Sequence, residues 1–170
     1  MTVFVALLRA VNVGGTGKLP MDDLKGICKN AGFKAIRTYI ASGNVVFESE
    51  KPAAQVKAAL EKKLHAYAGK PVGVLVRTAA EIADVLARNP FLTAAANRTV
   101  AIFLEEPPPH EVLESISGRK DEKLQLGKRE IYVHYGDGMG TSKLKIPAAR
   151  NGTARNMNTV AKLAAMANET

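Results

Sequence analysis

Residues 3–18 read Val-Phe-Val-Ala-Leu-Leu-Arg-Ala-Val-Asn-Val-Gly-Gly-Thr-Gly-Lys, an apolar run that leads directly into a glycine-rich basic loop. The apolar residues before Arg9 predict a strand that is buried on both faces. The glycines of the loop allow backbone conformations and close approaches that side chains forbid. Because a strand ending in such a loop is a platform for a ligand, we expect function at this end of the strand.

The composition is that of an ordinary globular protein. Of the 170 residues, 46% are hydrophobic and 24% are charged, and no stretch reaches the roughly 20 apolar residues of a membrane span. The N-terminal apolar run lacks the preceding basic residues of a secretion signal, and the single cysteine, Cys28, rules out an internal disulfide. We therefore expect a soluble, cytoplasmic protein with no membrane partner.

Hydrophobic spacing predicts the order βαββαβ for the first half of the chain. The predicted elements are a strand before Arg9, a helix from Pro20 to Gly32, a hairpin with strands at 34–40 and 45–47, a helix at 52–67 and a strand at 71–77. This order is that of the ferredoxin-like plait, in which two helices cover one face of a four-stranded antiparallel sheet.

A connector and a second, similar half follow. Thr78 and Glu81 form a capping box at the start of a connector helix. The predicted elements after it are a strand at 98–104, a short helix after Pro107, a hairpin at 123–135 and a last helix from about 154, in the order βαββα. The sequence thus predicts an α+β protein with two packed ferredoxin-like subdomains, 1–77 and 98–170, joined by residues 78–97. Their junction is the expected cleft.

The familiar nucleotide and metal motifs do not fit. In the phosphate-loop pattern, Asn12 stands where the first glycine belongs and Leu19 replaces the magnesium-binding hydroxyl. The dinucleotide fingerprint fails at both glycine-rich stretches. The histidines are far apart and lack other ligands at suitable spacing, so we predict no metal and no cofactor. Cys28 lies on the apolar stripe of its helix, which predicts a core residue and not a nucleophile.

Two other kinds of site have little support in the sequence. Ser42 and Ser142 are candidate nucleophiles, but neither has a visible base nearby. Tyr132 and His134 share a strand face on which a base could stack, but a half-buried edge pair explains them better. Catalysis therefore stays undecided.

What remains is a set of donors with almost no carboxylate among them. Its members are Arg9, Asn12, Gly14, Gly15, Lys18, Ser42, Asn44, Lys143, Arg155 and Asn156. With Thr153 as N-cap, Arg155 lies in the first turn of the last helix, where free amides favour an anion. Because a cation there is unfavourable to the helix, we expect Arg155 to serve either a ligand or a carboxylate of the other half.

Five stretches spread over nearly the whole chain carry a family resemblance. They are residues 7–15, Leu-Leu-Arg-Ala-Val-Asn-Val-Gly-Gly; 38–47, Thr-Tyr-Ile-Ala-Ser-Gly-Asn-Val-Val-Phe; 89–91, Asn-Pro-Phe; 142–144, Ser-Lys-Leu; and 153–160, Thr-Ala-Arg-Asn-Met-Asn-Thr-Val. Together they resemble the bacterial domain-of-unknown-function family sixteen-ninety-seven. Ala10 and Val11 depart from its usual Arg-Gly-Ile-Asn-Val-Gly-Gly loop, and Met157 stands where tryptophan is common. The resemblance implies two packed plait subdomains and brings no established activity, substrate, cofactor or catalytic residue.

Three functions stay open at this point. The first is a binding module for a phosphate-bearing or otherwise anionic ligand, nucleic acid included, in the cleft between the subdomains; the net charge of +8 fits such partners in general. The second is an enzyme that acts on a small anionic substrate through the same donors. The third is a protein-interaction scaffold in which the donors are structural. The lack of a carboxylate or histidine in the donor set favours binding.

Overall fold

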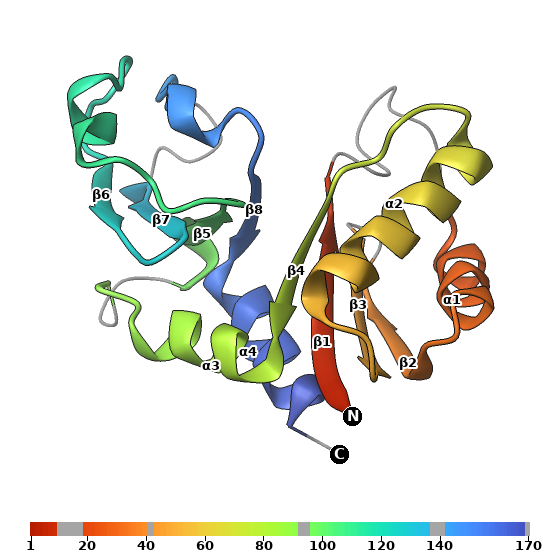
Figure 1. The fold of residues 1–170 in the computed structure, drawn as a ribbon. Helices are drawn as coiled ribbons and strands as arrows, with labels where there is room; N and C mark the ends of the chain where they lie inside the picture. The colour runs from red at the N-terminus through yellow and green to blue at the C-terminus, as the bar shows by residue number, and fades with distance from the viewer. Residues whose placement is uncertain (10–18, 41–42, 92–95, 137–141, 169–170) are drawn as a thin grey trace. The chain divides into compact units, whose positions relative to one another are not determined.

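The computed structural model describes residues 1–9, 19–40, 43–91, 96–136 and 142–168, without the side chain of residue 97 (Figure 1). Within these ranges the chain is a mixed α+β structure with four α-helices and two four-stranded antiparallel sheets. It divides into two compact units, Met1–Ile82 with Leu163–Thr170, and Ala83–Lys162. None of the described helices combines the length and the hydropathy that a bilayer span requires.

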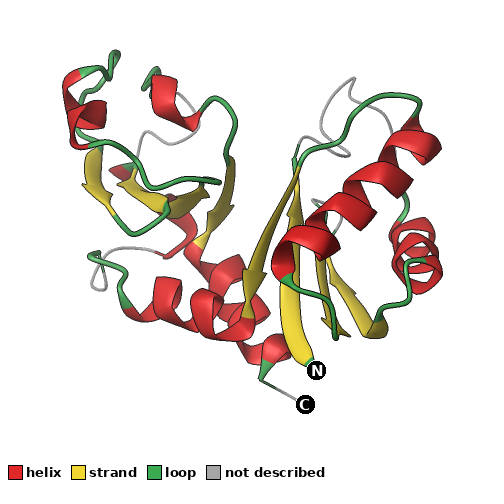
Figure 2. Cartoon of the chain, in the orientation of Figure 1, coloured by secondary structure: helices red, strands yellow, loops and turns green. Residues whose placement is uncertain are grey.

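The first unit contains the six elements predicted for the first half, with ends displaced by a few residues. They are β1 (Thr2–Leu8), α1 (Met21–Asn30), β2 (Lys34–Tyr39), β3 (Asn44–Ser49), α2 (Ala53–Ala68) and β4 (Val74–Thr78). The order across the sheet is β2-β3-β1-β4, so that β1 is a central strand paired with β3 and β4. Figure 2 shows α1 and α2 against one face of this sheet.

β1 is buried on both faces, which confirms the prediction from its apolar run. Every residue from Phe4 to Leu8 is at most 3% exposed. Phe4, Ala6 and Leu8 lie in the core between the sheet and the two helices, and this core includes Cys28 of α1. Cys28 is fully buried, which confirms it as a core residue, and this burial raises the pKa of its thiol to about 12.

The second unit has a sheet of the same relative strand order, with short 3-10 helices in its connections. The remaining elements of the chain are α3 (Ala79–Ala87), η1 (Ala96–Arg98), β5 (Thr99–Phe103), η2 (His110–Glu114), β6 (Lys123–Leu126), β7 (Glu130–His134), η4 (Pro147–Ala149), β8 (Thr153–Asn156) and α4 (Met157–Ala167). The order across the second sheet is β6-β7-β5-β8. The short helix predicted after Pro107 is the 3-10 helix η2. Val112 of η2 and the segment around Ile146 pack on one face of the sheet, where the first unit has α-helices.

The last helix begins three residues later than predicted, because the preceding residues form a strand. Thr153–Asn156 is β8, which pairs antiparallel with β5. Asn156 is the N-cap, since its Oδ1 accepts the N–H of Thr159 at 2.9 Å. Thr153 is therefore not the cap, and Arg155 lies on a strand and not in a helical first turn. The expected conflict between Arg155 and the helix dipole does not arise.

The two units repeat one arrangement of residues that the sequence did not reveal. Arg77 in β4 and Arg155 in β8 are both buried, and each donates from Nη1 to the carbonyl of the residue before it, at 3.2 and 3.0 Å. Each is followed by a residue, Thr78 or Asn156, whose side chain caps the next helix. The N–H of Thr78 is bonded in turn to Glu81 at 2.9 Å, which confirms the predicted capping box.

Glu122 holds together two segments of the second unit. Its carboxylate is buried; one oxygen accepts the N–H of Lys120 at 2.7 Å and the other accepts the hydroxyl of Ser142 at 2.9 Å. The bond from the Lys120 amide contributes most to a pKa of Glu122 that lies below the ordinary value, and Ser142 adds to it. Ser142, one of the candidate nucleophiles, therefore has a visible structural role.

Replacing Glu122 with Gln should destabilise the protein more at neutral than at acid pH. Because the folded-state pKa lies below the ordinary value of 4.5, the ionised carboxylate stabilises the fold above that value and loses this contribution as the pH falls through the folded-state pKa. Urea unfolding of wild type and Glu122→Gln at steps from about pH 7 to about pH 3 measures the difference. A difference that is constant over this range, or larger at low pH, would contradict the assignment.

Gly118 is the position where an added methyl group should do most harm. Its φ is +71°, and a Cβ atom would lie 2.0 Å from the backbone carbonyl oxygen of Lys143. Gly118→Ala should therefore cost more than about 1 kcal/mol. Gly26→Ala is the matched control, because Gly26 lies in α1 with nothing within 4 Å of the new Cβ, and it should stabilise by about 0.5–1 kcal/mol. Denaturant unfolding of both variants checks this, and a Gly118→Ala protein as stable as wild type would refute the close contact.

Candidate functional site

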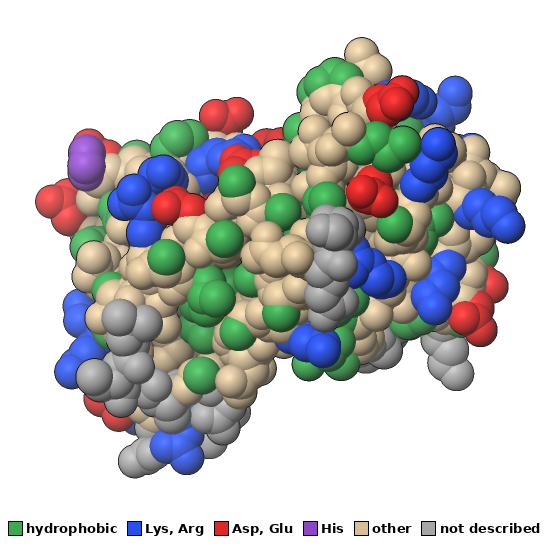
Figure 3. Space-filling model, turned by 90° about the horizontal axis from the view of Figure 1, so that it is seen from below, with side chains coloured by type: hydrophobic (Ala, Val, Ile, Leu, Met, Phe, Trp, Pro, Cys, Tyr) green, Lys and Arg blue, Asp and Glu red, His purple; other side chains and the backbone are tan. Residues whose placement is uncertain are grey.

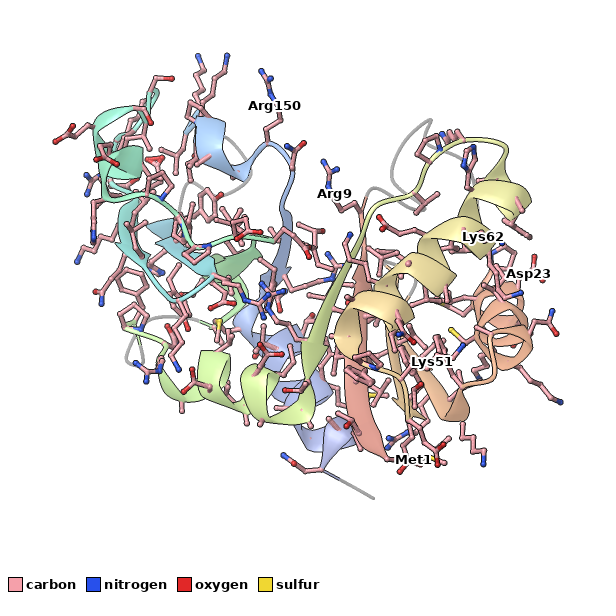
Figure 4. All side chains as sticks on the ribbon, in the orientation of Figure 1. Met1, Arg9, Asp23, Lys51, Lys62 and Arg150 are labelled. Atoms are coloured by element: carbon pink, nitrogen blue, oxygen red, sulfur yellow. The ribbon has the colours of Figure 1, made fainter. Side chains whose placement is uncertain are left out.

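A pocket of about 550 Å³ lies in the first unit, at the end of β1 and beside the second half of α2. We call it the Arg9 pocket. Its described lining is Arg9, Glu61, Lys62, His65, Pro71, Val72 and Gly73. Arg9 directly follows β1, at the end where the sequence predicts function. Figure 4 shows Arg9 beyond the end of β1 and Lys62 on α2.

The buried side of α2 determines which of its residues border the pocket. Leu60 and Leu64 are buried in the core of the first unit. Glu61 and His65 each follow one of these leucines, so they lie one turn apart on the flank of the helix, with Lys62 beside them. The hydrophobic packing of α2 therefore fixes the direction in which these polar side chains extend.

An ion pair on α2 also fixes the start of β4. The Nζ atom of Lys57 donates to Glu61 Oε1 at 3.0 Å and to the carbonyl of Val74 at 2.9 Å, and the N–H of Val74 faces Glu61 Oε2 at 3.4 Å. On the other side of the chain, toward β1, the carbonyl of Gly73 accepts a hydrogen bond from the N–H of Arg9 at 2.9 Å. Lys57 and Glu61 thus satisfy backbone groups at the outer edge of an edge strand.

Gly73 gives Arg9 room to lie along β4. A Cβ atom at Gly73 would approach Cδ of Arg9 to 3.0 Å and its Nη1 to 3.5 Å. With a larger residue at this position, the side chain of Arg9 would have to shift. A glycine inside a predicted strand signals a close approach of this kind, so Gly73 is the one feature by which the sequence marks the contact.

The described lining of the pocket contains charged side chains of both signs. Arg9 and Lys62 carry positive charge, and Glu61 is the one carboxylate among the described lining residues. Its charge is balanced by Lys57, and His65 adds ring nitrogens. Elsewhere in the described ranges, no three His, Cys, Asp or Glu side chains are grouped closely enough to hold a metal ion. The sequence analysis missed Glu61, Lys62 and His65 because they belong to no motif and occupy the polar side of an ordinary helix.

Half of the predicted donors lie outside the described residues. They are Asn12, Gly14, Gly15 and Lys18, which follow Arg9 in the chain, and Ser42 in the hairpin between β2 and β3. Their predicted roles stay predictions.

The other predicted donors are described, and Arg9 is the one among them that lines the pocket. Asn44 is fully buried and its side-chain amide donates to the carbonyl of Tyr39 at 2.9 Å, which closes the hairpin. Arg155 is 7% exposed; burial lowers its pKa to about 10, so it stays charged at neutral pH. Its Nη1 also donates to Thr153 Oγ1 at 2.8 Å. Asn156 caps α4, and Lys143 is exposed in a loop of the second unit.

Tyr132 and His134 are engaged in packing within the second unit. Tyr132 is 2% exposed and its hydroxyl donates to the carbonyl of Val85 at 2.7 Å. The ring of His134 lies 6.0 Å from that of Phe91, and its Nδ1 lies 3.0 Å from the hydroxyl of Thr99. The structure therefore agrees with the packing interpretation of this pair and not with a platform for a base.

The sequence and the fold were compared with those of known proteins. No curated protein matches the sequence. A solved structure, that of the conserved bacterial protein SP0830 from Streptococcus pneumoniae, is similar with a TM-score of 0.81 and 26% sequence identity, over 98% of this chain and 99% of that chain. The family model "Protein of unknown function (DUF1697)" matches residues 1–132. As the resemblance predicted, the chain belongs to this DUF1697 family of proteins of unknown function.

Proposed function

We propose that this protein is a binding module for a phosphate-bearing or otherwise anionic ligand, and that the Arg9 pocket is part of the binding site. The observation that carries the proposal is the pairing of Glu61 with Lys57 beside Arg9 and Lys62. The carboxylate of Glu61 is balanced by Lys57, and the pocket lining contains two cationic side chains, Arg9 and Lys62, to which we assign the contact with the anion. The volume of about 550 Å³ is typical of pockets that hold small molecules.

The two cations differ in what they offer an anion. The guanidinium of Arg9 is planar and presents donors in a fixed fork that matches two oxygens of a phosphate or carboxylate. The ammonium of Lys62 is a point charge on a flexible stem, and Lys62 is exposed. An anion held by both gains directionality from the arginine and additional charge from the lysine.

We infer that the fold which presents this site is a pair of ferredoxin-like units. The first unit combines the element order βαββαβ with the sheet order β2-β3-β1-β4, as that plait requires. The second sheet has the same relative order, β6-β7-β5-β8, with short 3-10 helices in its connections. In such a sheet, the end of the first strand and the start of the fourth are neighbours, so Arg9 and Gly73 meet.

The test is thermal unfolding of wild type, Arg9→Ala and Arg9→Lys in inorganic phosphate and in sulfate, at an ionic strength held constant with sodium chloride. A ligand that binds the folded state alone stabilises it by about 2.7 kcal/mol at roughly one hundred times its Kd. We expect the anions to raise the melting temperature of wild type, Arg9→Ala to lose most of this rise, and Arg9→Lys to keep part of it, because the charge is retained without the planar fork.

Lys63→Ala is the matched control for the loss of one positive charge. Lys63 lies next to Lys62 on α2 but is not part of the described lining, so the anion effect should persist in this variant. Equal rises in wild type and Arg9→Ala would place the anion elsewhere. No rise in wild type at any concentration of either anion would contradict the proposed function.

A further inference from the structure

We propose that Gly73 is a positioning residue of the Arg9 pocket: because it has no side chain, the stem of Arg9 lies against the start of β4, and this sets the direction of the guanidinium. The inference rests on the proposed function and assigns a second residue to the same site. Gly73 carries no charged group, so its contribution to anion binding is made through Arg9.

The side chain of Arg9 occupies the space that a side chain at position 73 would take. A Cβ atom at Gly73 would lie 3.0 Å from Cδ of Arg9, 3.6 Å from its Cγ and 3.5 Å from its Nη1. These atoms extend from the stem of the arginine to one end of its guanidinium. A side chain at position 73 would therefore change the path of Arg9 as far as its charged end.

The backbone conformation at position 73 does not by itself require a glycine. The described glycines with a left-handed φ are Gly32, Gly43, Gly69, Gly118 and Gly136. Gly73 is not among them, so other residues can adopt its backbone conformation without that strain. Among the described glycines outside this set, Gly73 is the one whose close neighbours all belong to a single charged side chain. The approach of Arg9 is thus what the glycine accommodates.

The backbone around this contact is held in place by hydrogen bonds. The carbonyl of Gly73 accepts the N–H of Arg9 at 2.9 Å. The next residue, Val74, is bound through its carbonyl to Lys57 at 2.9 Å, and its N–H faces Glu61 at 3.4 Å. A long, flexible side chain shifts more easily than a hydrogen-bonded strand. A new Cβ atom would therefore be accommodated by movement of the arginine and not of β4.

The direction of an arginine matters for an anion because its donors form a rigid, planar fork. Two parallel hydrogen bonds to one phosphate or carboxylate form only when the fork faces the two oxygens. A shift of the stem keeps the positive charge of Arg9 and loses this alignment. Gly73 therefore affects the directional part of anion binding and leaves the charge of the pocket unchanged.

Anion titrations of Gly73→Ala and Gly73→Val test the inference, with inorganic phosphate and sulfate as probes at constant ionic strength. A hydrogen bond from a charged donor is worth roughly tenfold or more in affinity, so we expect Gly73→Val to raise the Kd for both anions by about tenfold. Gly73→Ala should raise it less, because its side chain is smaller. Gly26→Ala is the control, since its new Cβ meets nothing within 4 Å, and its Kd should equal that of wild type.

These variants also control for weak anion binding to basic side chains outside the pocket. On the face seen from below in Figure 3, Lys and Arg side chains lie among Asp and Glu side chains. Because the glycine variants leave every charge in place, such background binding is the same in all of them. A difference in Kd between wild type and Gly73→Val is therefore not an effect of altered net charge.

Two further measurements show whether Gly73 acts through Arg9. The Nε–Hε NMR signal of Arg9, assigned by its loss in Arg9→Ala, should move in Gly73→Val without any anion present. In a double-mutant cycle, adding Gly73→Val to Arg9→Ala should leave the remaining anion affinity unchanged. A merely structural role of Gly73 predicts neither result. Urea unfolding verifies that the variants fold, and Gly73→Ala decides alone if Gly73→Val does not.

The possible failures are distinguishable. If Arg9→Ala weakens anion binding while both Gly73 variants bind as wild type does, the positioning role is overturned and the proposed function stands. An unmoved Arg9 signal in the Gly73 variants, or a tenfold loss that persists in the Arg9→Ala background, overturns it as well. If wild type binds neither phosphate nor sulfate, the proposed function fails and the inference fails with it.

Discussion

Burial of β1 on both faces is the constraint on which the first unit depends. A side chain such as Phe4, Leu7 or Leu8 contributes about 1.5–3 kcal/mol when it is removed from water, and all three are buried here. Both neighbours of β1 are strands, so its backbone groups are satisfied across β3 and β4. The apolar run has to end where the sheet ends, and Arg9 is the first residue beyond it. The burial that stabilises the sheet therefore also places the charged side chain of Arg9 at the edge of the core.

α2 connects stability with the candidate site. Its apolar stripe packs into the core, which leaves Lys57 and Glu61 to bind both backbone groups of Val74 at the edge of the sheet. An edge strand with open backbone groups invites pairing with another chain, and this ion pair covers part of that edge. In doing so it neutralises the carboxylate beside Arg9. The pairing of Glu61, which lines the pocket, is thus a consequence of how the strand edge is satisfied.

The features of the fold that were predictable from the sequence are those with a local signal. Strand β1, the helices α1 and α2, and the capping box at Thr78 each have a run, a spacing or a cap of their own. β8 has none: it is four residues long, its sequence Thr-Ala-Arg-Asn shows no apolar alternation, and its pairing with β5 is a long-range contact. Thr153 also has the chemistry of a helix cap, which misplaced the start of α4. Tertiary pairing overrode a plausible local signal.

The candidate site was predictable to the extent of Arg9. Lys62 and His65 are ordinary residues on the polar side of a helix, and their place in the same pocket lining as Arg9 depends on the packing of α2 over the sheet. No spacing in the sequence encodes that distance. Gly73 lies within the strand predicted at 71–77, but the side chain that approaches it, that of Arg9, is more than sixty residues away in the chain.

The second unit differs from the first at the position equivalent to Arg9. The registers Val5 with Arg77 and Ala101 with Arg155 align the pair β1–β4 with the pair β5–β8 position by position. Val5 of β1 thus corresponds to Ala101 of β5, and Arg9, four residues after Val5, corresponds to Glu105, four residues after Ala101.

The connections between equivalent strands differ as well. In the first unit, α2 connects β3 and β4. In the second unit, the described part of the equivalent connection, between β7 and β8, contains the short helix η4 and apolar side chains that pack on the sheet, among them Leu144 and Ile146. The equivalent corner therefore has a carboxylate in place of the guanidinium and no α-helix among the described residues to supply a lysine. Two sheets of the same strand order thus differ in the residue that follows the first strand of each unit, Arg9 after β1 and Leu104-Glu105 after β5.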